Sequence, residues 1–417
     1  MPSFAYANGQ LGADGVSLAE VAGRFGTPCY VYSRAAIERQ WHAYNGAFGA
    51  QSHLICYAVK ASSNIAILNV LARLGSGFDI VSGGELERVI RGGGDPRKVV
   101  FSGVGKRREE IQRALEAGIK CFNVESGAEL ELINRIAAAA DRTAPVSLRV
   151  NPDIDVNTHP YIATGLRVNK FGIPYESALA LYETAAAMSY IKVIGIDCHI
   201  GSQITVLTPF IDALTRLRIL IEQMARKGIS LMHIDIGGGL GINYRDEKAP
   251  TAEEYIRAVR DVFSGNTYEL IVEPGRSITG NAGVLLTRVE YIKKTPHRNF
   301  VIVDAAMNDI LRPSLYDAWH DIVPVQEARD GSGEGIYDIV GPVCETGDFL
   351  GRERKLSLAA GDLLAVCSAG AYGFSMSSTY NARPRACEVM LDRGRIHEIR
   401  RRETIEELMS GEALLPD

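Results

Sequence analysis

The sequence has only seven cysteines, and no two of them are separated by the two residues typical of redox and zinc motifs. Their odd number and wide spacing argue against a disulfide scaffold and against a structural zinc site. We therefore expect a reducing compartment, the cytoplasm. No apolar run approaches the roughly 20 residues that a membrane helix needs. The first residues lack a basic segment followed by an apolar one, so no signal peptide is predicted.

A strong excess of one charge is also lacking. The chain has 45 basic and 50 acidic residues, hence a formal charge of −5, and its pI is about 6.0. This mild acidity gives no reason to expect a nucleic acid as partner. Apolar residues make up 46% and charged residues 23%, the balance of an ordinary folded globular protein. A chain of 417 residues predicts two or three domains, or one large barrel with an appended domain.

Short β-branched runs alternate with amphipathic stretches over the first two-thirds of the chain. Stretches such as 107–117 and 129–140 carry apolar residues at spacings of three and four, as helices do. Eight strand candidates, of which each of the first seven precedes a helix candidate, predict a (β/α)8 TIM barrel over residues 36–282. An open, doubly wound sheet is the alternative. The strand candidates are 55–60, 77–81, 99–102, 121–124, 146–150, 193–198, 232–236 and 269–273.

After about residue 283, strand candidates follow one another with little helix between them. This pattern predicts an all-β domain, a small barrel or sandwich, over residues 283–417. The N-terminal segment 1–35 contains one strand-like piece, 28–32, which could belong to either domain; we expect it to join the β domain. The strand candidates here are 285–293, 300–304, 337–343, 363–368, 386–391 and 395–400.

Polar residues or glycines follow nearly every predicted barrel strand. In a TIM barrel the carboxyl ends of the strands surround the reaction site. Turn chemistry supplies some Ser, Asn, Asp and Gly at such positions, but it does not readily supply charged and imidazole side chains after apolar strands. The set therefore predicts a site. Its members are Lys60, Asp79, Ser82, Ser102, Asn123, Glu125, Arg149, Asn151, His199, Gly237, Gly238, Gly239 and Glu273.

Each member taken singly has a structural alternative. Lys60 is either a nucleophile or a side chain that reaches solvent, and the glycine run 237–241 is either a phosphate cradle or a tight turn. Glu273 could hold a protonated ring nitrogen or pair with Arg276, and a single histidine such as His199 is more often structural than catalytic. Together they suit pyridoxal phosphate. No His-Glu-x-x-His or Ser-His-Asp set supports a metal site or serine chemistry.

Several motifs resemble those of the alanine-racemase-like, barrel-type pyridoxal phosphate decarboxylases, and the similarity runs from about residue 27 to 391. In the barrel half these motifs are 57–61, 78–85, 199–203, 237–241 and 273–276. Later motifs are similar to those of the diaminopimelate decarboxylases within that family. They are 304–309, 312–316, 341–348 and 369–373.

The resemblance implies pyridoxal 5'-phosphate as the cofactor and gives each residue a role. Lys60 would be the Schiff-base lysine, His199 would stack on the ring, and Glu273 would bond the pyridine nitrogen. Tyr372 would anchor the cofactor and also line the substrate site. The phosphate and ring would be held by Ser202, Gly238, Gly239, Gly275 and Arg276, with Asp79, Glu85 and Arg149 in supporting positions near Lys60.

The resemblance further implies decarboxylation of meso-2,6-diaminopimelate to L-lysine and carbon dioxide, the last step of lysine biosynthesis. Glu345 would bind the distal ammonium of this substrate, while Cys344 would protonate the carbanion after carbon dioxide leaves. In this family both residues reach into the neighbouring subunit's site, so we expect a homodimer with shared active sites. The distal carboxylate would be bound by Arg276, Arg312 and Tyr316, because arginine binds carboxylates bidentately.

Three alternatives stay open. A related enzyme could act on ornithine, arginine or a carboxylated polyamine, and Asp317 follows Tyr316 where ornithine-type enzymes place a substrate-binding aspartate. Arg312 argues against this reading because it would repel a cationic tail. A cofactor-less regulatory homologue would be expected to lose Lys60 or the phosphate loop. A racemase would need a second catalytic base and has no reason to keep Cys344, which taken alone would be interpreted as a buried strand cysteine.

Overall fold

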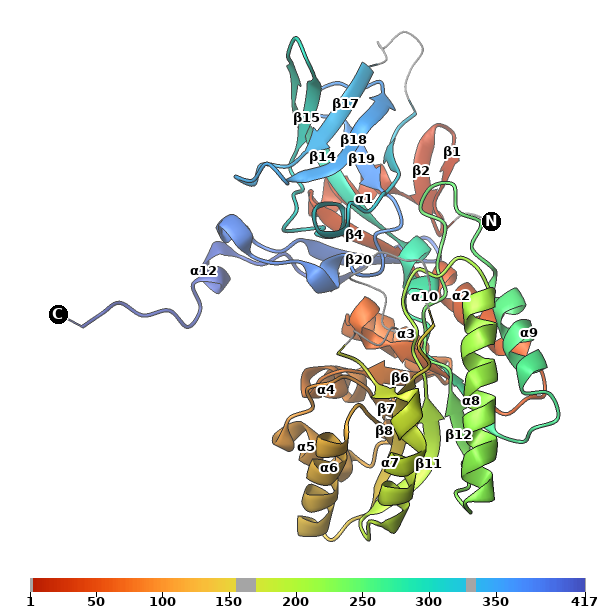
Figure 1. The fold of residues 1–417 in the computed structure, drawn as a ribbon. Helices are drawn as coiled ribbons and strands as arrows, with labels where there is room; N and C mark the ends of the chain where they lie inside the picture. The colour runs from red at the N-terminus through yellow and green to blue at the C-terminus, as the bar shows by residue number, and fades with distance from the viewer. Residues whose placement is uncertain (1–2, 155–169, 328–334, 417) are drawn as a thin grey trace. The chain divides into compact units, whose positions relative to one another are not determined.

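The computed structural model describes residues 3–154, 170–327 and 335–416. These divide into two compact units, which we name the barrel unit and the β unit. The barrel unit comprises Glu38–Asn243 and Glu247–Ile278. The β unit comprises Met1–Ile37, Tyr244–Asp246 and Thr279–Asp417. Helices and strands alternate in the first, whereas strands dominate the second (Figure 1), which confirms the predicted pairing of a barrel with an all-β domain.

Eight parallel strands close on themselves in the barrel unit. Their order is β9-β11-β12-β13-β5-β6-β7-β8, and β8 pairs back with β9. All eight predicted strands are present, and the two-residue strand β10 (Ile173–Pro174), which was not predicted, extends β9. The barrel strands are β5 (His53–Ala58), β6 (Gly77–Ile80), β7 (Val99–Phe101), β8 (Cys121–Val124), β9 (Ala144–Asn151), β11 (Ile191–Asp197), β12 (His233–Asp235) and β13 (Glu269–Val272).

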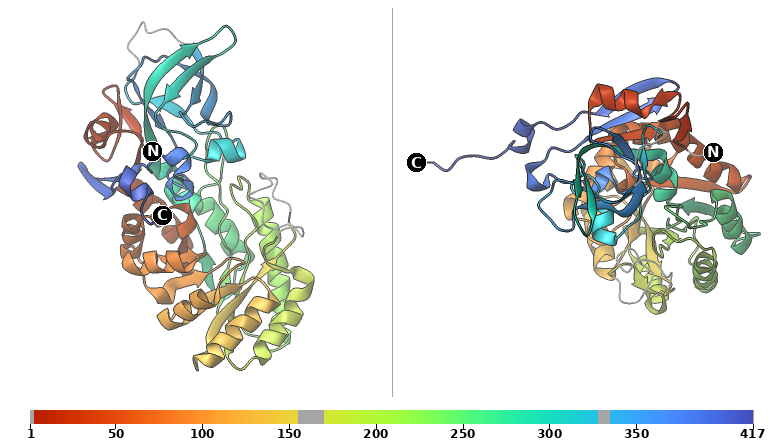
Figure 2. Two further views of the ribbon diagram at one scale, coloured as in Figure 1. Left: turned by 90° about the vertical axis from the view of Figure 1, so that its left-hand side faces the viewer. Right: turned by 90° about the horizontal axis from the view of Figure 1, so that it is seen from above.

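The helices of this unit lie outside the strands (Figures 1 and 2). α8 (Thr208–Arg226) shows why: its buried residues, from Phe210 to Met224, recur at spacings of three and four and form one apolar face. Among the described residues, no helix combines the length and hydropathy that a bilayer crossing requires. The other helices are α2 (Arg34–Phe48), α3 (Ile65–Arg73), α4 (Gly83–Arg91), α5 (Arg108–Ala117), α6 (Gly127–Ala139), α7 (Tyr175–Ala187), α9 (Ala252–Val262) and α10 (Arg276–Thr279).

Along two of the barrel strands, side chains two residues apart change from apolar to polar toward the carboxyl ends. One buried apolar cluster contains Cys56 of β5, Cys121 of β8 and Ile271 of β13. Two residues further along the last two of these strands stand buried Asn123 and Glu273. Because all eight strands are parallel, this alternation collects polar groups at one end of the barrel.

The β unit is built on one long sheet of the order β18-β17-β15-β14-β4-β20-β21. β4 (Cys29–Ser33) lies between β14 and β20, so the strand-like piece 28–32 belongs to this sheet. The six predicted strands are present, whereas β16 (Ile322–Pro324) and β18 were not predicted. The strands of the long sheet are β14 (Gly283–Lys294), β15 (Asn299–Val303), β17 (Gly335–Val340), β18 (Phe349–Leu356), β20 (Cys387–Asp392) and β21 (Arg395–Arg400), and β19 (Leu363–Val366) pairs with β14 and β16.

A small sheet precedes β4 in the same unit. It is formed by β1 (Ala5–Ala7), β2 (Gln10–Ala13) and β3 (Val16–Ser17) in antiparallel order, followed by α1 (Leu18–Phe25). Buried residues of β2 and α1, such as Leu11 and Val21, pack in one core with Val31 of β4 and Val389 of β20. This shared core ties the N-terminal segment to the β unit.

Candidate active site

Lys60 lies at the carboxyl end of β5, one short turn beyond the strand. The strand ends at Ala58, and Val59–Ala61 form a 3-10 turn, so the expectation that Lys60 closes the strand was wrong by two residues. Its ammonium contacts the carboxylate of Asp79 on the neighbouring strand β6. The Lys60 side chain is 35% exposed, while Asp79 is fully buried. An amine is thus held at the mouth of the barrel against buried negative charge.

A cluster of buried carboxyl groups lies inside the barrel at the same end. One oxygen each from Asp197, Asp235 and Glu273 lie within 4.8 Å of one another. Burial, followed by repulsion from Asp235, raises the pKa values of Asp197 and Glu273 well above their usual range. Burial likewise raises the pKa of Asp235 to about 6. A positive charge placed here would relieve the repulsion, so the cluster favours a cationic group.

Neutral donors reach this cluster from neighbouring strands. The Asn123 Nδ2 lies 3.3 Å from Asp235 Oδ2 and 3.5 Å from Glu273 Oε1, and the Gly237 N–H donates to Asp235 Oδ1 at 3.0 Å. The Asp79 Oδ1 atom is buried and has no hydrogen-bond partner among the described residues. The spacing alone would also suit a metal ion. Amide donors already pointing at these oxygens suit an N–H-bearing cation such as a pyridinium better.

Arg149 supplies fixed positive charge deeper in the site. Its Nη1 lies 2.8 Å from Glu125 Oε1, and its Nε lies 4.0 Å from Asp197 Oδ2. Glu125 also accepts hydrogen bonds from the Gly103 and Gly172 N–H groups, at 3.2 and 2.7 Å. All three charged side chains are buried. A buried arginine bonded in this way is rigid, because losing a partner would leave an uncompensated charge.

The glycine run after β12 packs against two other loops. A Cβ on Gly238 would lie 2.3 Å from the Glu273 carbonyl oxygen, and one on Gly239 would lie 2.5 Å from that of Gly201. Gly239 also has a φ of +113°, which other residues rarely adopt. A Cβ on Gly275 would lie 3.0 Å from that of Ala61. These glycines let the segments after four strands, β5, β11, β12 and β13, converge at the mouth of the barrel.

His199, Ser202 and Arg276 lie on these converging loops. The His199 Nδ1 accepts a hydrogen bond from the Gly238 N–H at 3.1 Å, and burial lowers the pKa of His199 well below its usual value. The ring is therefore neutral and fixed in orientation. The Arg276 Nη2 donates to the Ser202 Oγ at 3.0 Å. A guanidinium next to a hydroxyl is a suitable pair for an anionic group such as a phosphate or a carboxylate.

Glu85 lies in the first turn of α4. Its Oε2 accepts a hydrogen bond from the Val81 N–H at 2.7 Å, and Ser82 caps the same helix by accepting from the Glu85 N–H at 3.2 Å. Burial raises the pKa of Glu85 to about 7. The side chain therefore has a structural role at the helix start beside Lys60 and Asp79.

In the β unit, Arg312 begins the short helix α11 (Arg312–Tyr316) and is buried. Its Nη1 lies 2.7 Å from the His320 Nε2, and its guanidinium lies 4.4 Å above the Tyr244 ring. His320 and Tyr244 were not predicted, because only the fold brings them to Arg312. Asp317 ends α11 with a left-handed backbone, φ +51°. That conformation gives Asp317 a helix-ending role.

Cys344 and Glu345 lie in the turn 341–348 between β17 and β18, which we name the cysteine turn. Both are exposed, so the interpretation of Cys344 as a buried strand cysteine was wrong. The Cys344 N–H donates to Asn381 Oδ1 at 3.0 Å, and the Tyr380 hydroxyl donates to Glu345 Oε1 at 2.5 Å. Neither Asn381 nor Tyr380 was predicted.

The predicted residues fall into two groups, one in each unit. α11 touches the cysteine turn, because the Ser314 Oγ donates to the Gly347 carbonyl at 2.6 Å. Tyr372 follows β19 and has a left-handed backbone, φ +56°. The barrel group contains Lys60, Asp79, Glu85, Arg149, His199, Ser202, Gly238, Gly239, Glu273, Gly275 and Arg276. The β-unit group contains Arg312, Tyr316, Cys344, Glu345 and Tyr372.

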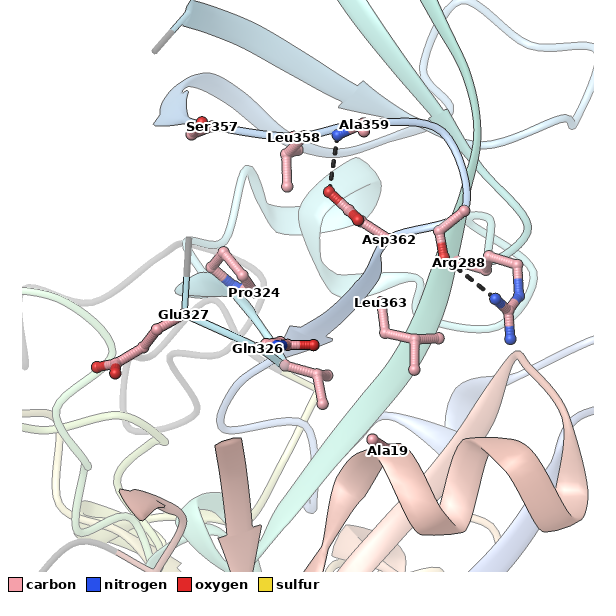
Figure 3. A pocket seen from close by; sticks show the side chains of 12 residues that line it. Ala19, Arg288, Pro324, Gln326, Glu327, Ser357, Leu358, Ala359, Asp362 and Leu363 are labelled. Atoms are coloured by element: carbon pink, nitrogen blue, oxygen red, sulfur yellow. Dashed lines mark hydrogen bonds between the residues drawn. The ribbon is translucent and has the colours of Figure 1, made fainter. Parts of the chain in front are cut away.

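A separate groove of about 410 Å³ lies in the β unit (Figure 3). None of the predicted site residues lines it. The Arg288 guanidinium donates to the Gly361 carbonyl at 3.1 Å, and the Asp362 carboxylate accepts from the Ala359 N–H at 2.7 Å. The Arg288 and Asp362 side chains thus bond to the groove's own backbone, and the groove is not a candidate for the reaction site.

The raised pKa of Glu85 predicts a pH-dependent stability. Because the pKa rises from 4.5 to about 7 on folding, the stabilising contribution of the protonated carboxyl is present below pH 4.5 and is lost as the pH rises to about 7. Glu85→Gln stays neutral and should gain about 1 to 3 kcal/mol relative to wild type between pH 5 and 8 in urea denaturation. Glu87→Gln, an exposed change in the same helix, is the control. Parallel pH profiles for wild type and Glu85→Gln would contradict the assignment.

Comparison with known proteins agrees with this geometry. Residues 34–280 match the pyridoxal binding domain of the pyridoxal-dependent decarboxylases. The chain is 61% identical over 416 residues to a diaminopimelate decarboxylase of Pseudomonas aeruginosa, and the match covers 100% of both chains. Two solved structures of diaminopimelate decarboxylases complexed with L-lysine are also similar.

The structure from Helicobacter pylori has 41% identity and a TM-score of 0.91, with 94% of this chain and 98% of that chain covered. The one from M. jannaschii has 38% identity and a TM-score of 0.94, with 99% and 98% covered. These matches confirm the resemblance predicted from the motifs. The chain belongs to the family of pyridoxal-dependent decarboxylases.

Proposed function

We propose that the chain decarboxylates meso-2,6-diaminopimelate to L-lysine and carbon dioxide, the last step of lysine biosynthesis. The names of its relatives and the L-lysine in the two similar structures support this substrate. Within the chain, the supporting observation is that the β unit carries one functional group of each sign: a buried guanidinium, Arg312, and a carboxylate, Glu345, on an exposed turn that can serve a partner's site. A substrate whose far end carries both a carboxylate and an ammonium needs one group of each sign.

The barrel group is suited to hold pyridoxal phosphate. When bound, this cofactor supplies an aldehyde that condenses with amines and a protonated ring that draws electrons from the substrate Cα. Lys60 provides the amine that holds the aldehyde, and Glu273 holds the proton of the ring nitrogen among buried carboxyl groups. The neutral His199 offers a flat face to the ring. Phosphate binding falls to Ser202, Gly238, Gly239, Gly275, Arg276 and Tyr372.

The β-unit group is suited to recognise the substrate. Arg312, with Arg276 and Tyr316, binds the distal carboxylate, because a guanidinium donates two parallel hydrogen bonds to it. Glu345 accepts from the distal ammonium. The Cys344 thiol delivers a proton to the substrate Cα after carbon dioxide leaves.

Decarboxylation of ornithine, arginine or a carboxylated polyamine is the second candidate. It would require acidic groups alone around a cationic tail. Asp317, the residue that could favour it, is exposed and ends α11 in the left-handed conformation. Arg312 would repel the cationic tail of such a substrate, so the charges of the site favour diaminopimelate.

The proposed assembly is a homodimer in the cytoplasm in which each chain completes its partner's site. The exposure of Cys344 and Glu345 supports this proposal, because groups that serve a partner must be accessible on their own unit. All seven cysteines lie among the described residues, and none forms a disulfide. Free thiols suit a reducing compartment.

The first test concerns the cofactor. Lys60→Ala should lose the yellow absorbance of protein-bound pyridoxal phosphate and essentially all turnover, because no other amine occupies that position. Lys98→Ala, which removes a lysine at the opposite end of the barrel, should keep both. A Lys60→Ala variant of normal colour and activity would refute the cofactor site.

The second test concerns the substrate. Arg312→Ala should reduce kcat/KM for diaminopimelate by a factor corresponding to about 2 to 5 kcal/mol, since it removes a charge-assisted pair. The loss for ornithine, which has no distal carboxylate, should be far smaller. Arg288→Ala in the separate groove should change neither value. Unchanged diaminopimelate turnover in Arg312→Ala would exclude this substrate assignment.

The third test concerns the shared site. Lys60→Ala and Cys344→Ala homodimers should both be nearly inactive. After mixing and re-dimerisation, about half of the dimers are hybrids with one intact site of two, so activity should return to about a quarter of wild type. If each site were built within one chain, every site in the mixture would still carry one of the two substitutions, and no activity would return. No recovery, with subunit exchange confirmed by mass spectrometry, would reject the shared site and leave the cofactor site standing.

A further inference from the structure

The cysteine turn is tied by two hydrogen bonds to one short segment, η5 (Tyr380–Ala382). The Tyr380 hydroxyl donates to the Glu345 carboxylate at 2.5 Å, and Asn381 Oδ1 accepts from the Cys344 N–H at 3.0 Å. Consecutive residues of one loop thus hold consecutive residues of another. The two residues held are those to which we assign substrate binding and proton delivery.

The backbone of η5 is unusual at the same positions. Asn381 and Ala382 both have left-handed backbones, with φ of +57° and +52°. Asparagine adopts this conformation readily, but alanine does so at a cost, and two in succession persist only where neighbours hold them. Arg383 supplies that hold: its Nε donates to Asn308 Oδ1 at 3.0 Å, and its Nη2 to the Asp304 carbonyl at 2.5 Å.

The far end of the cysteine turn is fixed to segment 304–309, the segment that also binds Arg383. Buried Asp348 accepts from the Met307 N–H at 2.7 Å through Oδ1 and from the Val343 N–H at 2.7 Å through Oδ2. The Ser378 N–H donates to the Asn308 carbonyl at 2.9 Å. Three segments, 304–309, 341–348 and 378–383, therefore form one hydrogen-bonded unit, which we name the loop frame. Within the loop frame, the 304–309 motif and Asp348 hold the cysteine turn in place by hydrogen bonds.

We propose that Tyr380 and Asn381 are positioning residues, with Tyr380 orienting the Glu345 carboxylate for the substrate's distal ammonium and Asn381 fixing the backbone of Cys344. This inference rests on the proposed roles of Glu345 and Cys344. An exposed glutamate loses rotamer freedom when it binds a ligand, and a bond formed beforehand removes much of that loss. The Tyr380 hydroxyl donates to one carboxylate oxygen of Glu345 and leaves the second oxygen to accept from the ammonium.

The chemistry of the Tyr380 hydroxyl fits this role. Its hydrogen bond to Glu345 raises the pKa of Tyr380, so the hydroxyl stays protonated and remains a donor over the working pH range. Hydrogen bonds to an ionised acceptor are shorter and stronger than those between neutral groups. Tyr380 is 45% exposed, so replacing it with phenylalanine removes the hydroxyl without opening a cavity.

Tyr380→Phe should raise KM for diaminopimelate about ten-fold, the value of a hydrogen bond to a charged group, while kcat stays within two-fold. In a Glu345→Ala background, which removes the acceptor of this bond, the same change should add less than two-fold, because the two residues act through one bond. Tyr291→Phe, on an exposed tyrosine of β14, should change neither constant. An unchanged KM, or effects that multiply fully in the double variant, would overturn the role of Tyr380.

Asn381 offers a matched pair of variants. Asn381→Gly accepts the left-handed backbone but lacks the acceptor, whereas Asn381→Asp keeps an acceptor oxygen. Asn381→Gly should lower kcat about ten-fold with KM within two-fold, and Asn381→Asp should stay within three-fold of wild type. Hydrogen exchange of a peptide that spans Cys344 should be at least ten-fold faster at that amide in Asn381→Gly alone. Equal exchange and equal kcat in Asn381→Gly and wild type would overturn the role of Asn381.

Two reference variants separate this inference from the proposed function. If Cys344→Ala and Glu345→Gln keep full activity on diaminopimelate, the proposed roles fail and the positioning roles fail with them. If these two lose activity while Tyr380→Phe and Asn381→Gly behave as wild type, only the positioning roles fail. Loss in all four, with the splits in KM and kcat given above, supports both.

Discussion

Buried negative charge at the carboxyl ends of the barrel strands is the constraint on which the rest of the site depends. Asp79, Asp197, Asp235 and Glu273 are all nearly or fully buried, and their pairwise repulsion adds to the cost of removing them from water. Lys60 and Arg149 offset part of that charge. Such an arrangement is costly for a purely structural core. It is useful where a cationic ring must be bound and kept protonated, because the cluster then stabilises the charged form of the ligand.

The remainder of the barrel supports this arrangement. Apolar residues such as Cys56 and Ile271 fill the interior away from the mouth, so the charged groups are confined to one end. Parallel strands deliver polar side chains to that end, and glycines let the following loops meet closely. In the β unit, the loop frame holds Cys344 and Glu345 by bonds from neighbouring segments. Each unit therefore fixes its own functional groups before any ligand arrives.

Much of the fold was predictable because its signals are local. The barrel strands are short runs in which apolar residues predominate, and helices between them, such as α8, have regular apolar spacing. β18 was missed because its Gly-Arg-Glu-Arg-Lys stretch lacks that apolar pattern, and β16 has only three residues. Lys60 was placed in a strand because its neighbours are apolar, whereas backbone hydrogen bonding ends the strand at Ala58.

The site was predictable only where motifs mark it. Lys60, His199 and Glu273 end or follow strands, where polar residues stand out in the sequence. Asp197 and Asp235 were missed because each lies inside its predicted strand, 193–198 or 232–236, whereas in the structure each is the last residue of its strand. Contacts such as Tyr244 with Arg312, or Asn381 with Cys344, join segments far apart in the chain. No local pattern records such pairs, so only the fold reveals them.

The central claim is that one site binds pyridoxal phosphate and a substrate charged with both signs at its far end. The most direct test is carbon dioxide release by the purified protein with pyridoxal phosphate, measured in parallel on meso-diaminopimelate, ornithine and arginine. The account predicts rapid release from diaminopimelate, with L-lysine formed in equal amount, and little from the other two. Equal or faster release from ornithine or arginine would contradict it.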